Sequence, residues 1–111
     1  MPLFITRGNY TINAVSGLIA KPEDRTEAIS KVFAGLGAKL QALYYTCGEY
    51  DFMIIVEAPS EKEVLAGLIV AAGTGTVTNL NTTLAWTAAE MKDAFVKASS
   101  AIKNFHPAGR A

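Results

Sequence analysis

The sequence predicts an α+β fold in which two strand–helix–strand units share one four-stranded sheet. Two strand-like runs meet at a short turn near the middle of the chain, and helical periodicity stands on either side of them. A further strand and a last helix follow, so the order is βαββαβ plus an extra C-terminal helix. This order is typical of the ferredoxin-like fold, an antiparallel sheet with two helices on one face.

The first predicted strand spans residues 2–10, and the hairpin spans residues 38–59. The hairpin is indicated by two runs rich in aromatic and β-branched residues, with Gly48, Glu49, Tyr50 and Asp51 between them. Gly48 can adopt a positive φ, and Asp51 can bond backbone amides. For Tyr50 and Asp51 the sequence leaves two readings open, a site at the hairpin tip or turn chemistry alone.

The first helical region has two parts. Thr11 is a suitable N-cap for a helix, because apolar residues recur at helical spacing after it. The Lys21-Pro22 pair interrupts this helix. Pro22 is expected to begin the next helix, because its missing N–H is not needed at the first position. Gly37 is the expected left-handed residue at the end of that helix.

Two capping boxes predict the remaining helices. Ser60 with Glu63, and Thr87 with Glu90, each place an acidic residue three positions after a hydroxyl residue. The last strand is expected between these helices, over residues 76–86. The final helix has a narrow apolar seam of the kind that packs along a partner, made of Met91, Phe95, Ala98, Ile102 and Phe105.

Length and composition favour one domain with a second buried surface. The chain has 111 residues, half of them hydrophobic, and such a surplus suggests an oligomer interface. We expect a ferredoxin-like domain over residues 1–98, with the helix end and a flexible C-terminal tail over residues 99–111. His106 is expected to be a solvated tail residue.

Charge and cysteine usage limit the partners and the compartment. Ten Lys and Arg residues balance ten Asp and Glu residues, and no basic stripe indicates nucleic-acid binding. No signal-peptide pattern or run of about 20 apolar residues indicates export or a membrane span. Because Cys47 is the single cysteine, an internal disulfide is excluded, and we expect a cytoplasmic protein. Cys47 itself is expected to be a small buried residue rather than a reactive thiol.

Strand alternation predicts an apolar face that meets the helices and a second, mixed face. The mixed face combines large apolar groups with polar ones, which neither bulk water nor a dry core explains. Packing of this face on a second subunit, around a partly polar cavity, accounts for both. The apolar face is assigned Leu40, Ala42, Tyr44, Phe52, Ile54, Val56, Leu80, Thr82, Leu84 and Trp86; the mixed face is assigned Lys39, Gln41, Leu43, Tyr45, Cys47, Met53, Ile55, Glu57, Asn79, Asn81, Thr83 and Ala85.

The hairpin resembles that of the GYD-domain family, here as Gly48-Glu49-Tyr50-Asp51 followed by a strand that ends in Glu57-Ala58-Pro59. Lys21-Pro22 with Arg25 is also similar to the family pattern, and the resemblance covers about residues 2 to 90. It implies a dimeric α/β barrel, in which two ferredoxin-like sheets pack face to face. It implies no particular activity, since relatives in the wider fold include oxygenases, isomerases, haem-degrading enzymes and ligand-sensing modules.

Candidate site residues come mainly from the mixed face. The candidate ligand-binding residues are Arg7, Lys39, Tyr45, Glu57 and Asn81. Glu57 is the one catalytic candidate, as a general acid or base, or alternatively it forms an ion pair between subunits with Lys39 or Arg7. A second candidate is an anion site formed by Arg7, Lys21 and Arg25, weighed against ordinary surface charge. No ligand spacing indicates a metal, and no motif indicates a cofactor.

Three functions remain open at this stage. The first is a homo-oligomeric protein that binds or senses a small organic molecule, held between the sheet and the helices or between subunits. The second is a cofactor-independent oxygenase or isomerase, in which Glu57 would move a proton and Tyr45 or Asn81 would orient an oxygen. The third is a structural oligomeric protein whose mixed face is closed entirely by its partner.

Overall fold

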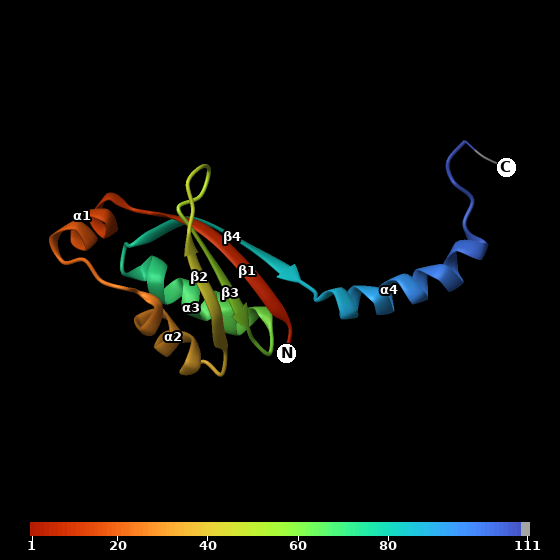
Figure 1. Ribbon diagram of the computed structural model, residues 1–111, viewed down its shortest axis with the longest axis horizontal. Helices are drawn as coiled ribbons and strands as arrows, with labels where there is room; N and C mark the ends of the chain where they lie inside the picture. Colours follow the sequence, from red (N-terminus) through yellow and green to blue (C-terminus); the bar gives the residue numbers. More distant parts are fainter. Residues whose placement is uncertain (110–111) are drawn as a thin grey trace.

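The computed structural model describes residues 1–109, and its centre is one antiparallel sheet in the strand order β2-β3-β1-β4 (Figure 1). The first strand–helix–strand unit joins β1 to β2, and the second joins β3 to β4. The order places β3 between the strands of the first unit and β1 between the strands of the second, as the ferredoxin-like prediction requires. The elements are β1 (Leu3–Tyr10), α1 (Ile12–Ala20), α2 (Thr26–Ala34), β2 (Lys39–Tyr45), β3 (Phe52–Glu57), α3 (Glu61–Gly73), β4 (Val77–Ala85), α4 (Ala88–Ala101) and a short 3-10 turn, η1 (Ile102–Asn104).

The first helical region divides as predicted, but its second helix starts later than expected. Thr11 caps α1, since its hydroxyl accepts a hydrogen bond from the backbone N–H of Ala14 at 3.3 Å. The prediction that Pro22 begins the next helix is wrong, because α2 begins at Thr26. The Asp24 carboxylate accepts the Thr26 N–H at 2.9 Å, so a side-chain turn stands where a first helical turn was expected.

The other helix boundaries confirm their capping signals. The Ser60 hydroxyl caps α3 by accepting the Lys62 N–H, and it also bonds the Glu63 carboxylate. Thr87 and Glu90 form a complete capping box at α4, with reciprocal bonds of 3.2 and 2.8 Å. These bonds hold the pKa of Glu90 below its usual range. Gly37 is left-handed, with φ of 76°.

The core lies between the sheet and α2 and α3. On β3 the predicted alternation is confirmed, with Phe52, Ile54 and Val56 buried toward the helices. On β4 the assignment of Thr82 and Leu84 to this face is confirmed by their partners on β1, Thr6 and Phe4. The remaining buried apolar residues of this cluster are Phe33, Ala38, Ala58, Val64 and Leu68.

A bulge in β2 reverses the faces predicted for the second half of that strand. Leu40 lies opposite Val56, but the next paired residue is Ala42, opposite Ile55. Gln41 is therefore the extra residue of the bulge, and every later side chain points to the other face. The predictions of Tyr44 in the core and Tyr45 on the mixed face are both wrong, because Tyr44 lies opposite the mixed-face Met53 and Tyr45 lies opposite the core residue Phe52.

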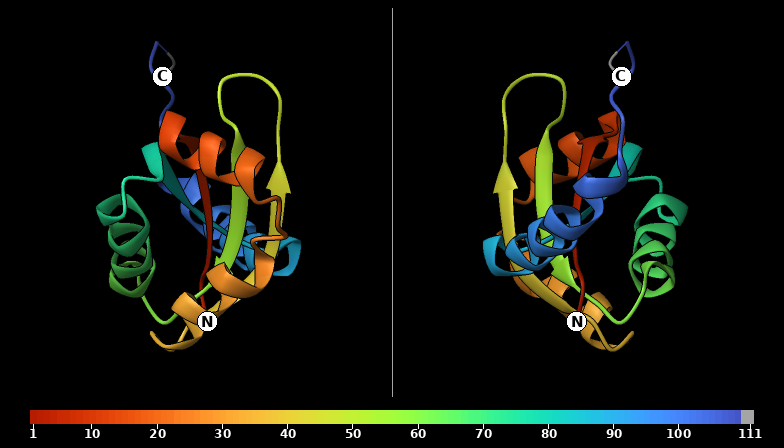
Figure 2. Two further views of the ribbon diagram at one scale, coloured as in Figure 1. Left: turned by 90° about the vertical axis from the view of Figure 1, so that its left-hand side faces the viewer. Right: turned by 90° about the vertical axis from the view of Figure 1, so that its right-hand side faces the viewer.

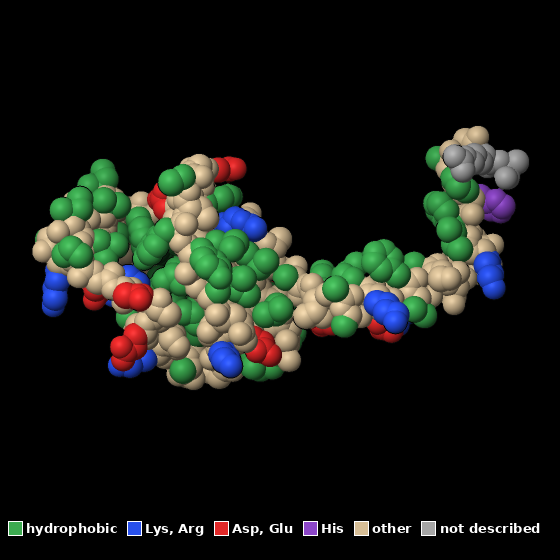
Figure 3. All heavy atoms as spheres, in the orientation of Figure 1, with side chains coloured by type: hydrophobic (Ala, Val, Ile, Leu, Met, Phe, Trp, Pro, Cys, Tyr) green, Lys and Arg blue, Asp and Glu red, His purple; other side chains and the backbone are tan. Residues whose placement is uncertain are grey.

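The opposite side of the sheet has no helix of α1–α3 against it, and we call it the open face. The two views in Figure 2 show α3 to one side of the strands and the loop between β2 and β3 rising above them. Along β1 the side chains of Leu3, Ile5 and Arg7 belong to the open face, because they alternate with buried Phe4, Thr6 and Gly8. Figure 3 shows hydrophobic side chains gathered over the strands in the middle of the body.

Helix α4 projects away from the body (Figures 1 and 3). None of its fourteen residues is buried, and large apolar side chains along it, including Phe95 and Val96, are exposed. The radius of gyration is 18.5 Å, whereas a compact chain of this length has about 13 Å. Beyond η1 the chain is irregular, and Arg110 and Ala111 of the predicted tail lie outside the described residues. Within residues 1–109 no helix is long and apolar enough to cross a membrane.

Two helical glycines give opposite expectations for an added methyl group. A Cβ at Gly67 would lie 2.4 Å from a ring atom of buried Phe33, so Gly67→Ala should destabilise the fold by about 1–3 kcal/mol. Nothing lies within 4 Å of a Cβ at Gly17, so Gly17→Ala should stabilise it by about 0.5–1 kcal/mol. Urea denaturation of both variants measures the difference, and a stabilising Gly67→Ala would contradict the packing described here.

Candidate functional site

The predicted site residues lie on both sides of the sheet. Arg7, Glu57 and Asn81 are on the open face, and Lys39 lies beside Glu57 on the neighbouring strand. Tyr45 lies on the helix side instead, because the β2 bulge turns it there. The sequence-predicted set therefore does not form one site.

On the open face the structure brings Arg7 and Asn81 together. Arg7 lies near the middle of β1, with Asn81 opposite it on β4 and Met53 opposite it on β3. Its side chain is half-buried although no helix covers it. A cation, an amide and a thioether therefore stand in one row across the sheet.

Glu57 ends β3 at the edge of this face. Its carboxylate accepts a hydrogen bond from the Gln41 side-chain amide at 2.6 Å and lies 3.9 Å from the N-terminal amine of Met1. Among the described residues of one chain, these two groups are its partners. The predicted ion pair with Lys39 or Arg7 of another subunit stays a prediction. A shallow hollow of about 460 Å³ beside it is lined by Leu3, Gln41, Ile55, Glu57, Met1 and, from the start of α4, Thr87 and Glu90.

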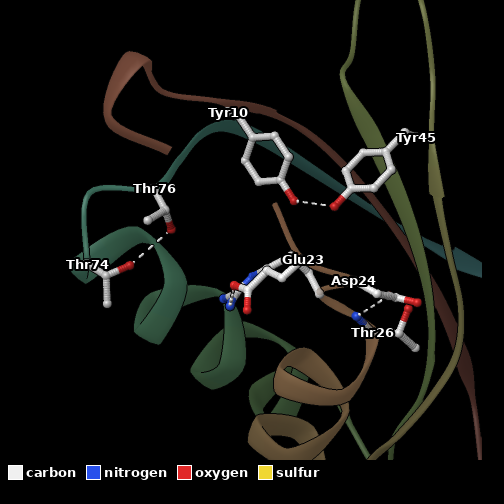
Figure 4. A network of polar contacts seen from close by, with 8 residues as sticks. Tyr10, Glu23, Asp24, Thr26, Tyr45, Thr74 and Thr76 are labelled. Atoms are coloured by element: carbon white, nitrogen blue, oxygen red, sulfur yellow. Dashed lines mark hydrogen bonds and ion pairs between the residues drawn. The ribbon is translucent and has the colours of Figure 1, made fainter. Parts of the chain in front are cut away.

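On the helix side, Tyr10 and Tyr45 form a hydroxyl pair that the sequence did not reveal. Their oxygens lie 3.0 Å apart, and Tyr10 also packs against Phe52 with ring centroids 5.2 Å apart. Figure 4 shows the two hydroxyls turned toward each other. Burial first, and then the hydrogen bond to Tyr45, raises the pKa of Tyr10 well above its ordinary value.

Tyr10 belongs to the lining of a cavity between the sheet, α2 and α3. Its volume is about 140 Å³, and its lining is mostly apolar, with Ile29, Phe33, Leu43, Phe52 and Leu68 among the residues. Arg25 contributes the one charged side chain of this lining. The sequence could have predicted that Tyr10 faces the helices, because Tyr10 lies an even number of residues after Phe4 and Thr6 on β1 and side chains alternate along a strand. The position of Tyr45 depended on the bulge.

The predicted cation cluster is divided between the two sides. Lys21 and Arg25 line a second chamber of about 350 Å³ beneath α1, which shares Tyr10 and Arg25 with the first cavity. The Arg25 guanidinium pairs with the Glu23 carboxylate at 2.7 Å. Arg7 lies across the sheet and belongs to neither chamber.

The hairpin motif ties the loop to β1. Gly48 has φ of 137°, as the turn prediction requires. The Asp51 carboxylate accepts the backbone N–H of Tyr10 at 2.9 Å, and the Asp51 N–H donates to the Gly8 carbonyl at 2.8 Å. Asp51 thus bonds a backbone amide, as its structural reading predicts, and the bond fixes the strand that carries Tyr10. Tyr50 is half-buried beside it.

The remaining candidates lie apart from both cavities. Cys47 is exposed, so the prediction of a buried cysteine is wrong, because the residue stands in the loop beyond β2. His106 is exposed, as expected for a tail residue. Within residues 1–109, no group of three or more His, Cys, Asp or Glu side chains is placed to hold a metal ion.

Comparison with known proteins gives a family match, a relative of known description and similar solved structures. The family model described as "GYD domain" matches residues 4–95. A protein of Thermus thermophilus, described as a glutamine synthetase and cystathionine beta-lyase binding protein, is 30% identical over 77 residues, which are 69% of this chain and 81% of the relative.

Two solved structures are also similar. The crystal structure of FFRP-DM1 has 18% sequence identity and a TM-score of 0.45, covering 78% of this chain and 100% of that one. TTHA0845 from Thermus thermophilus has 20% identity and a TM-score of 0.44, covering 79% and 96%.

The raised pKa of Tyr10 predicts a pH dependence of stability. Above its ordinary value of 10.0 the unfolded chain loses the Tyr10 proton while the folded protein retains it, so stability falls as the pH rises. Replacement by Phe removes this contribution. Between pH 10 and about 11.5 the free energy of unfolding should fall less steeply for Tyr10→Phe than for the wild type. Equal slopes for the wild type and Tyr10→Phe would contradict the burial of Tyr10.

Proposed function

The chain belongs to the GYD-domain family, and on that premise we propose that it is a homo-oligomeric protein that binds or senses a small organic molecule. In this proposal two copies pair as a dimeric α/β barrel, with the open faces of their sheets against each other. The pairing unit is the domain over residues 1–98, and residues 99–111 form the helix end and tail. Because Cys47 as a lone cysteine fits a reducing compartment, we place the protein in the cytoplasm.

The observation that carries the proposal is the apolar character of the open face. Ile5, Met53 and Ile55 lie side by side across β1 and β3, and none of α1–α3 packs on them. A continuous apolar surface of this kind on a small protein is typical of an interaction site. A second copy offers the same surface in the self-complementary arrangement that a two-fold axis requires.

Pairing of the open faces would also give the polar residues a role. Arg7 and Asn81 stand in the same row as Met53, so a facing sheet would enclose them together. A charged group removed from water needs a partner. In the proposed dimer that partner is a polar ligand or a group of the facing subunit, as the ligand-binding assignment of Arg7, Lys39, Glu57 and Asn81 supposes.

Helix α4 supports assembly by a second route. Its capping box defines the start of a stable helix, yet its exposed apolar side chains have no cover from its own chain in residues 1–109. Covering one such Phe or Val is worth about 1.5–3 kcal/mol. We propose that α4 lies along a neighbouring copy and so extends the interface beyond the sheet.

A role in protein binding is the second candidate, and the Thermus thermophilus relative favours it. That relative is described as binding glutamine synthetase and cystathionine beta-lyase. Applied to this chain, the same behaviour would make the oligomer a regulatory partner of metabolic enzymes. A pull-down with the purified oligomer and candidate enzymes separates this role from small-molecule binding alone.

The pairing proposal predicts a charge-sensitive oligomer. Ile55→Lys puts a cation in the middle of the proposed interface, so sedimentation velocity should show a monomer, or a dimer weakened by at least about tenfold. Ile69→Lys is the matched control, because Ile69 is 60% exposed on α3, on the other side of the sheet. It should leave the oligomer intact. A wild-type monomer, or an Ile55→Lys protein that assembles normally, would refute the pairing.

A further inference from the structure

The cavity on the helix side has the two features of a binding site for a small amphipathic molecule. Its walls are apolar, formed by Phe33, Phe52, Leu68 and neighbouring side chains. Its polar residues include Tyr10, Arg25 and Thr76, which also line the adjoining second chamber, and we call the part where the two meet the polar end. Few convergent polar groups on an otherwise apolar wall are typical of ligand sites.

The cavity exists because small residues line it. Ala28 on α2 and Ala71 on α3 stand where larger side chains would reduce the space between the two helices and the sheet, whereas Phe33 already occupies the space beside Gly67. Protein interiors are normally packed with few voids larger than a water molecule. The hollow of about 140 Å³ is not such a void, because Ala28 and Val70 of its lining are exposed; it is a partly open cleft that an occupant can enter.

The size of the hollow limits the occupant. A cavity of roughly 150 Å³ with apolar walls can hold a benzene molecule, so about 140 Å³ admits one ring or a short branched chain. The second chamber under α1 adjoins this space through Tyr10, Arg25 and Thr76, and it gives the polar end of an occupant a way to solvent.

The charges at the polar end favour an anion. Arg25 is the charged side chain of the inner cavity, and the outer chamber adds Lys21 and Glu23. Two cations and one carboxylate leave one positive charge. The Glu23–Arg25 pair joins partly exposed side chains, and such pairs are weak. A guanidinium has five N–H donors, so it can bind a second carboxylate beside Glu23 or in its place.

We propose that this cavity binds a small monocarboxylic acid with an aromatic or branched aliphatic body. The body lies among Phe33, Phe52 and Leu68, and the carboxylate meets the Arg25 guanidinium and the Tyr10 hydroxyl. The Tyr10–Tyr45 hydrogen bond orients that hydroxyl, and Asp51 fixes the backbone of Tyr10. This inference rests on the proposed function only in treating the chain as a ligand-binding protein, and the site lies on the opposite side of the sheet from the proposed dimer interface.

Calorimetry on the full chain tests the ligand class with size-matched probes. Phenylacetate and 4-methylvalerate are the acids, and phenethylamine and methyl phenylacetate carry a positive or no charge on a body similar to that of phenylacetate. At least one of the two acids should bind roughly tenfold or more tightly than phenethylamine and than methyl phenylacetate. Failure of both acids at millimolar concentration, or equal binding of the amine, would overturn the inference.

Matched variants test the site. Arg25→Gln should weaken binding of the acid by roughly tenfold or more. Lys31→Gln should not, because Lys31 lies on α2, the helix that Arg25 precedes, and is exposed and away from the cavity lining. Glu23→Gln should tighten binding, because it removes the competing carboxylate, and a purely structural role of Arg25 would not produce this gain. Ala71→Leu should abolish binding by filling the space. Unchanged affinity in Arg25→Gln, or weaker binding in Glu23→Gln, would overturn the assignment.

Sedimentation of each sample keeps the two proposals separate. An intact oligomer that binds neither acid would refute the ligand class and leave the pairing standing. A monomer that binds phenylacetate through Arg25 would refute the pairing and leave the cavity site standing.

Discussion

The bulge in β2 decides which side chains reach each side of the sheet. Gln41 is the extra residue against β3, and the pairing continues with Ala42 opposite Ile55. Without this residue the period of two would place Leu43 and Tyr45 on the open face. With it, Leu43 joins the core and Tyr45 meets the hydroxyl of Tyr10. The helix-side cavity therefore depends on this bulge, which brings Leu43 into its lining, whereas the open-face apolar residues Ile5, Met53 and Ile55 come from β1 and β3.

Much of the fold could be predicted from the sequence, because its signals are local. Caps at Thr11, Ser60 and Thr87 and the left-handed Gly37 act within a few residues of themselves, and the structure confirms each of them.

The candidate site was less predictable, because it depends on register between strands. A bulge leaves no local signal as strong as a cap, so the faces of Tyr44 and Tyr45 were reversed. The late start of α2 came from competition between a side-chain turn and helix initiation at Pro22, both of which the local sequence allows. The partners of Glu57 also had to come from the structure, since a carboxylate at a strand end can reach several groups.

The sheet separates two surfaces with different chemistry. Its helix side has a small cavity with a polar end. Its open side has the apolar residues Ile5, Met53 and Ile55, with Arg7 beside Met53. β1 contributes to both, because Tyr10 faces the helices and Ile5 and Arg7 face away. In the proposed oligomer, a ligand beside Tyr10 would touch the same strand that forms the interface. This shared strand offers a physical route by which binding could alter assembly, provided that the ligand has different affinities for the two states.

The central claim is that the open face is closed by a second copy of the chain. Nuclear Overhauser effects between differently isotope-labelled copies in one mixed sample test it most directly. Methyl groups of Ile5, Met53 and Ile55 should show contacts that arise only between copies, and those contacts should weaken on dilution. The claim would be contradicted if these methyl groups contacted only their own chain and solvent while the protein remained assembled, because the copies would then meet through another surface.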